Sequence, residues 1–389
     1  MSNKFISYLS DFFILLLVFS FFNDNFIVDN FGEQSLKILF ILFFIFYILP
    51  ILRNLKTMTT KQDKLLFAFF TANTIVFLLQ IIVNPMDDIV SPALLLIASL
   101  TITIYFSRYP ISKLLYFIWA SMMASVVMCY FNDPISEWTF RTTGGTGDPN
   151  EFATQLLIFL FVSFYLYSIN KSRIFLVVSM LFFLYGLFYA GSMSSFIALG
   201  IIAIFYLIIN FQRLIKYFLS YKGIILIAVL LSTIIWVDFT KVEAVSNMLG
   251  RTEQTGTVNT RLDSWISGLH MIEENPILGV GINSYDDNSK KYAEVFLNEG
   301  STAPHNVFVK LAAESGVIVF VLFLAFLSIL FFKNFRFIVR SSFLSIWLAS
   351  LSVIFMGLSL GITYDKYFWL AIAMLMHVNY LFQKGYIRS

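Results

Sequence analysis

Charge and cysteine are both scarce in this chain of 389 residues, and each scarcity excludes a class of protein. Charged residues make up 13% of the chain, against roughly 25% in soluble domains, which excludes a soluble globular enzyme and a nucleic-acid-binding protein. Cys129 is the single cysteine, so neither an intramolecular disulfide nor a thiolate metal site can form. Three histidines do not favour a zinc site, and we expect neither a metal nor a cofactor.

Most of the chain consists of apolar residues. Hydrophobic residues make up 59% of the chain, 46 residues are Phe, and the mean hydropathy is +0.81. A helix needs about 20 apolar residues to cross the hydrocarbon of a bilayer. The sequence predicts an all-α polytopic membrane protein with twelve spans, near residues 5–22, 35–52, 65–83, 89–107, 112–131, 152–169, 173–190, 192–210, 223–239, 305–332, 341–361 and 366–383.

The distribution of charge predicts the orientation of these spans. When the connections alternate between two sides, one side holds 17 of the 26 basic residues but only two acidic residues, Asp11 and Asp63. Basic loops stay in the cytoplasm, so we expect both termini there. Residues 5–22 follow Lys4 as in a signal peptide, but no small-x-small cleavage site comes after them, and we interpret them as the first span.

Three regions follow from this topology. Residues 1–239 contain the first nine spans, residues 240–304 form a long outward loop, and residues 305–389 contain the last three spans. Within the loop, residues 260–275 predict an amphipathic helix at the membrane interface, with Thr260 as its N-cap and Pro276 after its end. The apolar stripe of this helix consists of Trp265, Leu269 and Ile272.

His305 is the candidate catalytic base. We expect Pro304 in the first turn of the tenth span, which places His305 at the positive end of that helix. A positive helix end disfavours the imidazolium, and a neutral imidazole can accept a proton. The simpler interpretation is that His305 only caps the helix.

Arginines in the outward loops are candidate phosphate ligands, since their planar donors match phosphate oxygens. Arg261 is the first candidate, and its alternative is an ion pair with Asp263 or Glu253. Arg251 and Arg141 could bind phosphate or anchor lipid headgroups. One base with arginines and no metal set suits transfer from a phosphate-activated donor, for which a lipid pyrophosphate is the candidate at this depth.

Other polar residues have two interpretations each. Asp148 and Asn150 could bind sugar hydroxyls, but the glycine-rich run before them also suits a turn with Asn150 capping the next helix. Ser192 stands at a helix start that could bind phosphate. Lys310 and Glu314 are four residues apart in the tenth span, where we expect structural support.

Several of these residues belong to a recognisable pattern. The pattern consists of Arg261-x3-Trp265, Glu274-Asn275-Pro276-x-x-Gly279-x-Gly281, His305-Asn306, Glu314-x-Gly316 and, earlier, the segment GDPNEFA at 147–153. Over roughly 138–330 the chain resembles the O-antigen polymerase and ligase family.

The resemblance implies a twelve-span, GT-C-like, metal-independent glycosyltransferase acting on undecaprenyl-pyrophosphate-linked glycans at the periplasmic face of the bacterial inner membrane. By motif position, His305 would be the base and Arg261 the loop arginine near the pyrophosphate, with Asn306 beside them as a substrate-binding candidate. Met193 stands where many members have an arginine, so a second phosphate ligand would come from Arg141 or Arg251.

We therefore expect an O-antigen polymerase that joins lipid-linked repeat units by inverting transfer. The alternative within the family is a ligase that transfers finished polymer to the lipid A–core, and the alternative from another class is a transporter or flippase of lipid-linked polysaccharide. Expected partners are the lipid-linked oligosaccharide and bilayer lipid, with no nucleic acid. The family also implies a polysaccharide chain-length regulator.

Overall fold

The computed structural model describes residues 3–83, 88–132, 141–170, 172–211, 256–292 and 303–386, and the elements in these ranges are helices. The N-terminal half contains α1 (Asn3–Phe22), α2 (Asp24–Phe31), α3 (Glu33–Thr57), α4 (Lys61–Val83), α5 (Val90–Phe106), α6 (Ile111–Asn132), α7 (Pro149–Asn170), α8 (Arg173–Ala190) and α9 (Met193–Ile209). The C-terminal half contains α13 (Gly256–Glu274), α14 (Tyr285–Tyr292), α15 (Val307–Phe332), α16 (Phe335–Ile338), α17 (Leu344–Met356) and α18 (Lys366–Gln383).

The structure supports a multi-pass membrane protein but not the predicted count of twelve spans. Eleven predicted spans coincide with helices, and the one near 223–239 lies outside the described residues. Among the described helices, six are long and apolar enough to cross a bilayer: α3, α4, α6, α7, α8 and α15. A seventh is added if α1 and α2, which meet at a 100° bend, form one broken span. Helices α5, α9 and α17 are apolar but have only 13 to 17 residues, fewer than the roughly 20 that span the hydrocarbon.

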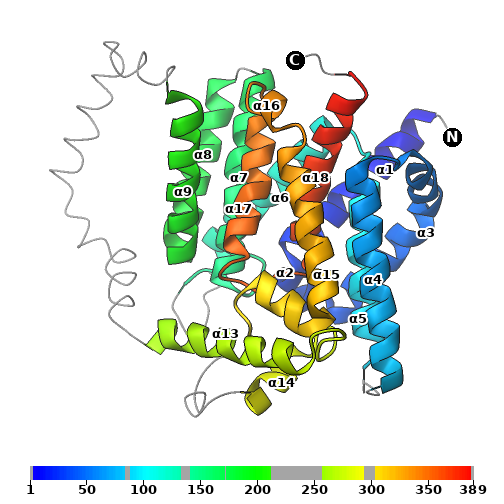
Figure 1. Cartoon of the computed structure of the whole chain (residues 1–389). Coiled ribbons are helices and arrows are strands. Elements are labelled where there is room, and N and C mark those ends of the chain that lie inside the picture. The colour runs from blue at the N-terminus through cyan, green and yellow to red at the C-terminus, as the bar shows by residue number, and fades with distance from the viewer. Residues whose placement is uncertain are drawn as a thin grey trace.

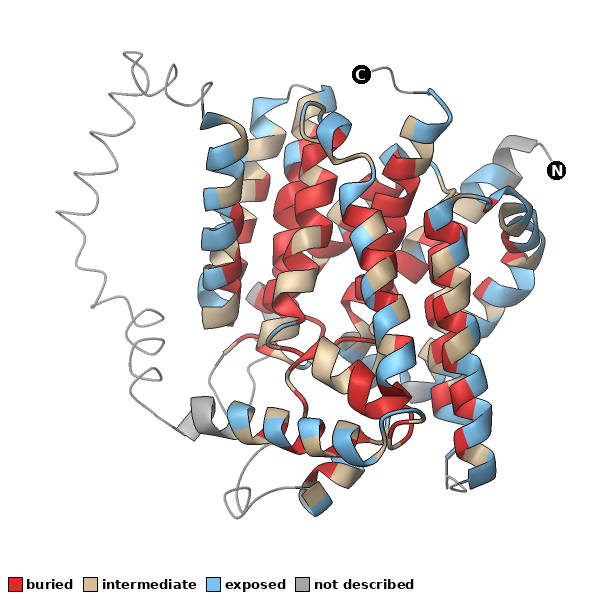
Figure 2. Ribbon diagram, viewed as in Figure 1, coloured by how far each residue is buried: buried red, intermediate tan, exposed pale blue. Residues whose placement is uncertain are grey.

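The bundle is arranged around α7. This helix packs against α6, α8 and α17 and is buried along most of its length (Figure 2). Helix α15 packs against α4, and α18 against α5 and α17. Outer helices such as α3 and α9 expose apolar side chains, Ile45 and Ile204 among them, which suits a surface that faces lipid acyl chains.

Helices α13 and α14 lie at one end of this bundle. Helix α13 runs across the bundle, and α1 begins and α18 ends at the opposite end (Figure 1). The predicted assignment of the ends of α1 and α18 to the cytoplasm stays a prediction.

The predicted loop helix is present, but two details of the prediction were wrong. Helix α13 begins at Gly256 rather than after Thr260, because residues 256–260 continue the same helix. Its buried face is formed by small residues and Met271, whereas Leu269 of the predicted stripe is 54% exposed. The helix thus packs closely on the bundle and turns an apolar face outward.

Candidate functional site

A loop at residues 275–282 and a break in α15 explain why Gly279, Gly281 and Gly316 belong to the sequence pattern. Helix α15 is interrupted at Gly316, whose φ of 82° and ψ of 167° are not helical. The interrupted turn pairs with the loop through backbone hydrogen bonds from Val280 N to Ala313 O at 2.8 Å, Gly281 N to Glu314 O at 3.2 Å and Val317 N to Pro276 O at 2.8 Å. The break therefore exposes backbone groups of α15 that the loop satisfies.

Glycine is required on both sides of this contact. A Cβ added to Gly279 would lie 2.4 Å from the backbone carbon of Glu314, and one added to Gly316 would lie 2.2 Å from the carbonyl oxygen of Ile277. Both glycines also have positive φ, which side chains disfavour. The two motifs are thus two halves of one backbone contact.

Gln80 of α4 holds the same contact from the side. Its Nε2 donates to the carbonyl oxygens of Leu278 and Glu314, and its Oε1 accepts from Ile282 N at 3.3 Å. The Glu314 carboxylate accepts from the Tyr285 backbone at 3.3 Å. Its Oε1 also lies 4.0 Å from Lys310 Nζ, in line with the structural support expected for this pair.

These contacts position α13 and its arginine. The Tyr285 hydroxyl donates to the carbonyl oxygen of Ser264, and Ser264 Oγ donates to the carbonyl oxygen of Ala303 at 2.7 Å. Ser264 lies one helical turn from Arg261, and Ala303 is two residues before His305. The hydrogen bond therefore joins the arginine-bearing helix to the histidine-bearing segment.

His305 directly precedes the cap of α15. Asn306 Oδ1 accepts from Phe308 N at 2.9 Å and Val309 N at 3.2 Å, so Asn306 is the N-cap and the helix begins at Val307. The expectation that Pro304 lies in the first turn was wrong, since Pro304 precedes the cap and packs against Gly361. His305 still lies at the positive end of α15, with a φ of 44° that L-residues rarely adopt.

His305, Arg261 and Asp148 form one electrostatic group. Burial lowers the pKa of His305 from 6.5, the charge of Arg261 lowers it further, and the carboxylates of Asp148 and Asp286 oppose this. Burial also lowers the pKa of Arg261, and Asp148 opposes that shift as well. The net effect is a neutral imidazole at pH 7 beside a charged guanidinium, which stays protonated because arginine titrates far above neutrality.

The electrostatic partners of Arg261 favour a site over a local ion pair. Asp148 shifts the pKa of Arg261 from a distant part of the chain. Asp263 is only two residues away on α13, and residues at that spacing do not face each other on a helix. The alternative partner Glu253 lies outside the described residues, as does Arg251.

Asp148 is also the cap of α7, where the sequence suggested Asn150. Its Oδ1 accepts from Asn150 N at 2.6 Å and from Glu151 N at 3.0 Å. Asn150 instead uses its side chain to join other elements, because its Oδ1 accepts from Arg141 Nη2 at 3.0 Å and from Ser192 Oγ at 2.8 Å. The predicted residues Arg141, Asn150 and Ser192 are therefore in direct contact.

Arg141 lies beside the place where the resembled family has its arginine. Its Nε donates to the carbonyl oxygen of Ala190 at 2.6 Å, three residues before Met193. Asn150 connects Arg141 to Asp148 through the cap of α7, and the charge of Asp148 acts on Arg261 and His305. Asp286 was missed, although its position after the glycine-rich turn at 279–281 was a signal that could have found it. Within the described ranges no three metal-ligating side chains gather.

Comparison with known proteins finds a family match for the central part of the chain. Residues 175–324 match the model of a family described as O-antigen ligase, a range that begins in α8, ends in α15 and includes Arg261 and His305. The curated proteins contain no match to the chain. The protein is thus a multi-pass membrane protein, and its residues 175–324 are similar to the O-antigen ligase family.

Proposed function

We propose that the protein is a glycosyltransferase of the bacterial inner membrane that extends a surface polysaccharide at the periplasmic face. The donor is a glycan on undecaprenyl pyrophosphate, and the acceptor is a hydroxyl of a second lipid-linked unit. The observation that carries this proposal is the group of His305, Arg261 and Asp148, two of which lie inside the family domain. A neutral base beside a half-buried cation suits attack on a sugar whose leaving group is an anion.

In the proposed reaction, the acceptor oxygen forms a bond to the anomeric carbon of the donor sugar. The bond between that carbon and the pyrophosphate oxygen breaks, and the pyrophosphate leaves with the electron pair. The acceptor proton passes to the imidazole of His305, whose lowered pKa keeps it unprotonated beforehand. Because the acceptor attacks opposite the leaving group, the anomeric centre inverts.

Arg261 stabilises the negative charge that develops on the departing pyrophosphate. Asp148 stabilises the imidazolium once His305 has taken the proton, since its carboxylate favours the charged form of that ring. Arg141, which donates to the carbonyl oxygen of Ala190, supplies a second guanidinium. These roles use only side chains and need no metal.

A ligase is the second candidate, and the description of the matched family favours it. Such an enzyme would use the same base and arginine but transfer finished polymer to the lipid A–core. Met193, in place of the arginine expected from the resemblance, favours the polymerase instead.

The glycan profile of a deletion strain separates the two candidates. Lipid A–core bearing a single repeat unit indicates a polymerase, and uncapped core with accumulated polymer indicates a ligase. His305→Ala and Arg261→Gln should fail to restore wild-type glycan. His270→Ala should restore it, because the half-exposed His270 lies on the same helix as Arg261 and pairs with Glu273 at 3.4 Å. Wild-type chain lengths with His305→Ala would remove His305 from the mechanism.

A biochemical assay separates both candidates from a transporter. The purified protein, given lipid-linked substrate in detergent without any ion gradient, should form longer glycans or capped acceptor. Absence of any new glycosidic bond under these conditions, with folded protein, would contradict the proposal.

A further inference from the structure

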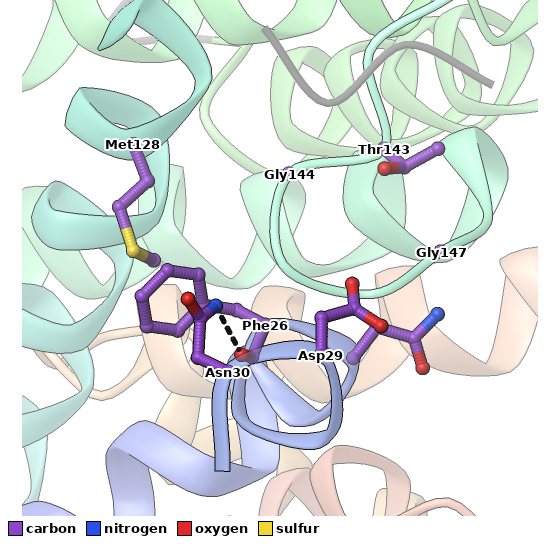
Figure 3. A pocket seen from close by; sticks show the side chains of 8 residues that line it. Phe26, Asp29, Asn30, Met128, Thr143, Gly144 and Gly147 are labelled. Atoms are coloured by element: carbon purple, nitrogen blue, oxygen red, sulfur yellow. Dashed lines mark hydrogen bonds between the residues drawn. The ribbon is translucent and has the colours of Figure 1, made fainter. Parts of the chain in front are cut away.

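A cavity of about 250 Å³ lies beside the candidate site, between α2, α6 and the loop at 143–147 (Figure 3). Ligand sites for drug-sized molecules measure roughly 300–1,000 Å³. A cavity slightly below that range suits one sugar ring rather than an oligosaccharide. We refer to it as the α2 cavity.

The lining of the α2 cavity combines polar groups with an apolar face. Asn25, Asp29 and Asn30 of α2 and Thr143 of the loop supply amides, a carboxylate and a hydroxyl. Phe26 and Met128 supply the apolar part, and Figure 3 shows them on the same side. Neighbouring hydroxyls of a sugar need both donors and acceptors, which amides and a carboxylate provide. An aromatic ring offers its face to the C–H side of the same sugar.

The charge of the lining indicates which sugars fit. Asp29 is the only ionisable residue among the lining residues, and its exposed carboxylate has no hydrogen bond or ion pair with other described side chains. Because the described lining residues include no cation, the cavity does not suit phosphate or a sugar acid. Neutral and N-acetylated sugars meet no such repulsion.

The cavity is built into the fold by the bend between α1 and α2. Helix α2 turns 100° away from α1 and is held against the loop by two backbone hydrogen bonds, from Asn25 N and Phe26 N to Gly145 O at 2.9 and 3.3 Å. Gly147 has a φ of 77°, and a Cβ there would lie 1.8 Å from Asn25 Nδ2. A larger residue at Gly147 would thus displace Asn25 and close part of the cavity.

The loop that lines the cavity also carries Asp148. Gly147 faces the α2 cavity, and the next residue interacts with Arg261 and His305. Thr146 Oγ1 donates to the carbonyl oxygens of Thr143 and Asp148. These hydrogen bonds fix the loop between the α2 cavity and Asp148. The 143–147 loop therefore connects the α2 cavity to a residue of the candidate site.

We propose that the α2 cavity binds one uncharged sugar of the acceptor glycan and thereby selects the acceptor. This inference rests on the proposed function, because it assumes that a lipid-linked glycan is the acceptor. The substrate class it names is a neutral or N-acetylated pyranose, recognised by Asp29, Asn30 and Asn25 with Phe26 against the ring.

The test is ligand-observed saturation-transfer NMR on the full-length protein in nanodiscs. The probes are the methyl glycosides of glucose, N-acetylglucosamine and glucuronic acid. Wild-type protein should transfer saturation to a neutral glycoside and not to the glucuronide. Asp29→Asn should weaken neutral-sugar binding by about tenfold, the effect of losing one hydrogen bond to a charged group, and should admit the glucuronide.

Two matched controls separate recognition from folding. Asp287→Asn removes an exposed carboxylate on α14, outside the cavity, and should leave binding unchanged. Asn30→Ala and Asn210→Ala each remove an asparagine that donates to the carbonyl four residues earlier, at 2.8 and 3.2 Å, but only Asn30 lines the cavity. Only the Asn30 variant should lose sugar binding.

Failure of this inference differs from failure of the proposed function. Equal sugar binding by wild type and Asp29→Asn, or no binding of any glycoside, would overturn the cavity proposal while glycan synthesis persists. His305→Ala should bind sugar like wild type yet form no glycan. Sugar binding that depends on Asp29 in a protein that forms no glycosidic bond would support the cavity and overturn the enzyme.

Discussion

Replacing Gly316 with alanine tests the contact between the 275–282 loop and the broken turn of α15. The φ of 82° and ψ of 167° at Gly316 belong to a region that is essentially restricted to glycine, where another residue costs about 2 kcal/mol. The added Cβ would also lie 2.2 Å from the Ile277 carbonyl oxygen, so the loop must move and the hydrogen bond from Val317 N to Pro276 O breaks. A lost backbone hydrogen bond costs about 1 kcal/mol.

We therefore expect Gly316→Ala to lose about 3 kcal/mol of stability. For domains of roughly 150–250 residues, each kcal/mol shifts the melting temperature by about 2–4 °C, so the shift should be on the order of 5 °C or more. The assay is the apparent Tm of purified protein in detergent, followed by tryptophan fluorescence at a fixed heating rate. Transfer activity should fall as well, because the loop positions the helix that carries Arg261.

Gly200→Ala is the matched control. Nothing lies within 4 Å of a Cβ added at Gly200, which is an exposed residue in the middle of α9. Alanine in a helix is about 0.5–1 kcal/mol better than glycine, so the apparent Tm should stay level or rise. An unchanged Tm for Gly316→Ala, or an equal loss for both variants, would refute the idea that the loop and the break in α15 stabilise each other.

Three further changes test other contacts. Asp148→Asn keeps a capping side chain but removes a carboxylate that raises the pKa of His305. The acid limb of the pH profile of the transfer rate should therefore move to lower pH. A move to higher pH would contradict the electrostatic interaction between Asp148 and His305. Gln80→Leu removes the hydrogen bonds to Leu278 and Ile282 of the 275–282 loop and should lower the apparent Tm by the equivalent of about 2–3 kcal/mol. A wild-type Tm would show that the loop needs no support from α4. Asn150→Ala should reduce donor affinity, measured as a raised KM for the lipid-linked donor, because Arg141 loses a positioning contact; a changed kcat with an unchanged KM would point to another role.

Hydropathy located the helices well but could not show where they break. The window average over 305–332 sees one long apolar run, yet α15 is interrupted at Gly316 because a loop some 40 residues earlier in the chain pairs with its backbone. Likewise the segment 5–31 contains a 100° bend that brings α2 against the 143–147 loop. Both features depend on contacts between distant segments, which local composition does not record.

Motif spacing predicts two residues of the candidate site but not the third. His305 and Arg261 were identified by position in a resembled pattern, and the structure brings them within electrostatic reach of each other. The sequence does not predict their electrostatic interaction with Asp148, because it depends on how segments far apart in the chain come together. The sequence predicts Asn150 as the cap of α7, whereas the cap is Asp148. Both Asp and Asn are good caps, and the sequence does not distinguish which of the two accepts from the first turn of the helix.

The backbone of His305 also decides how an inactive form of the protein is best made. A φ of 44° costs an L-residue about 1 kcal/mol or more, and glycine adopts it freely. His305→Gly would therefore relieve strain while it leaves an imidazole-sized space, so thermal resistance should rise as turnover is lost. Added free imidazole could then occupy that space and restore part of the transfer rate. Such a chemical rescue separates the role of the imidazole ring from that of the backbone at residue 305.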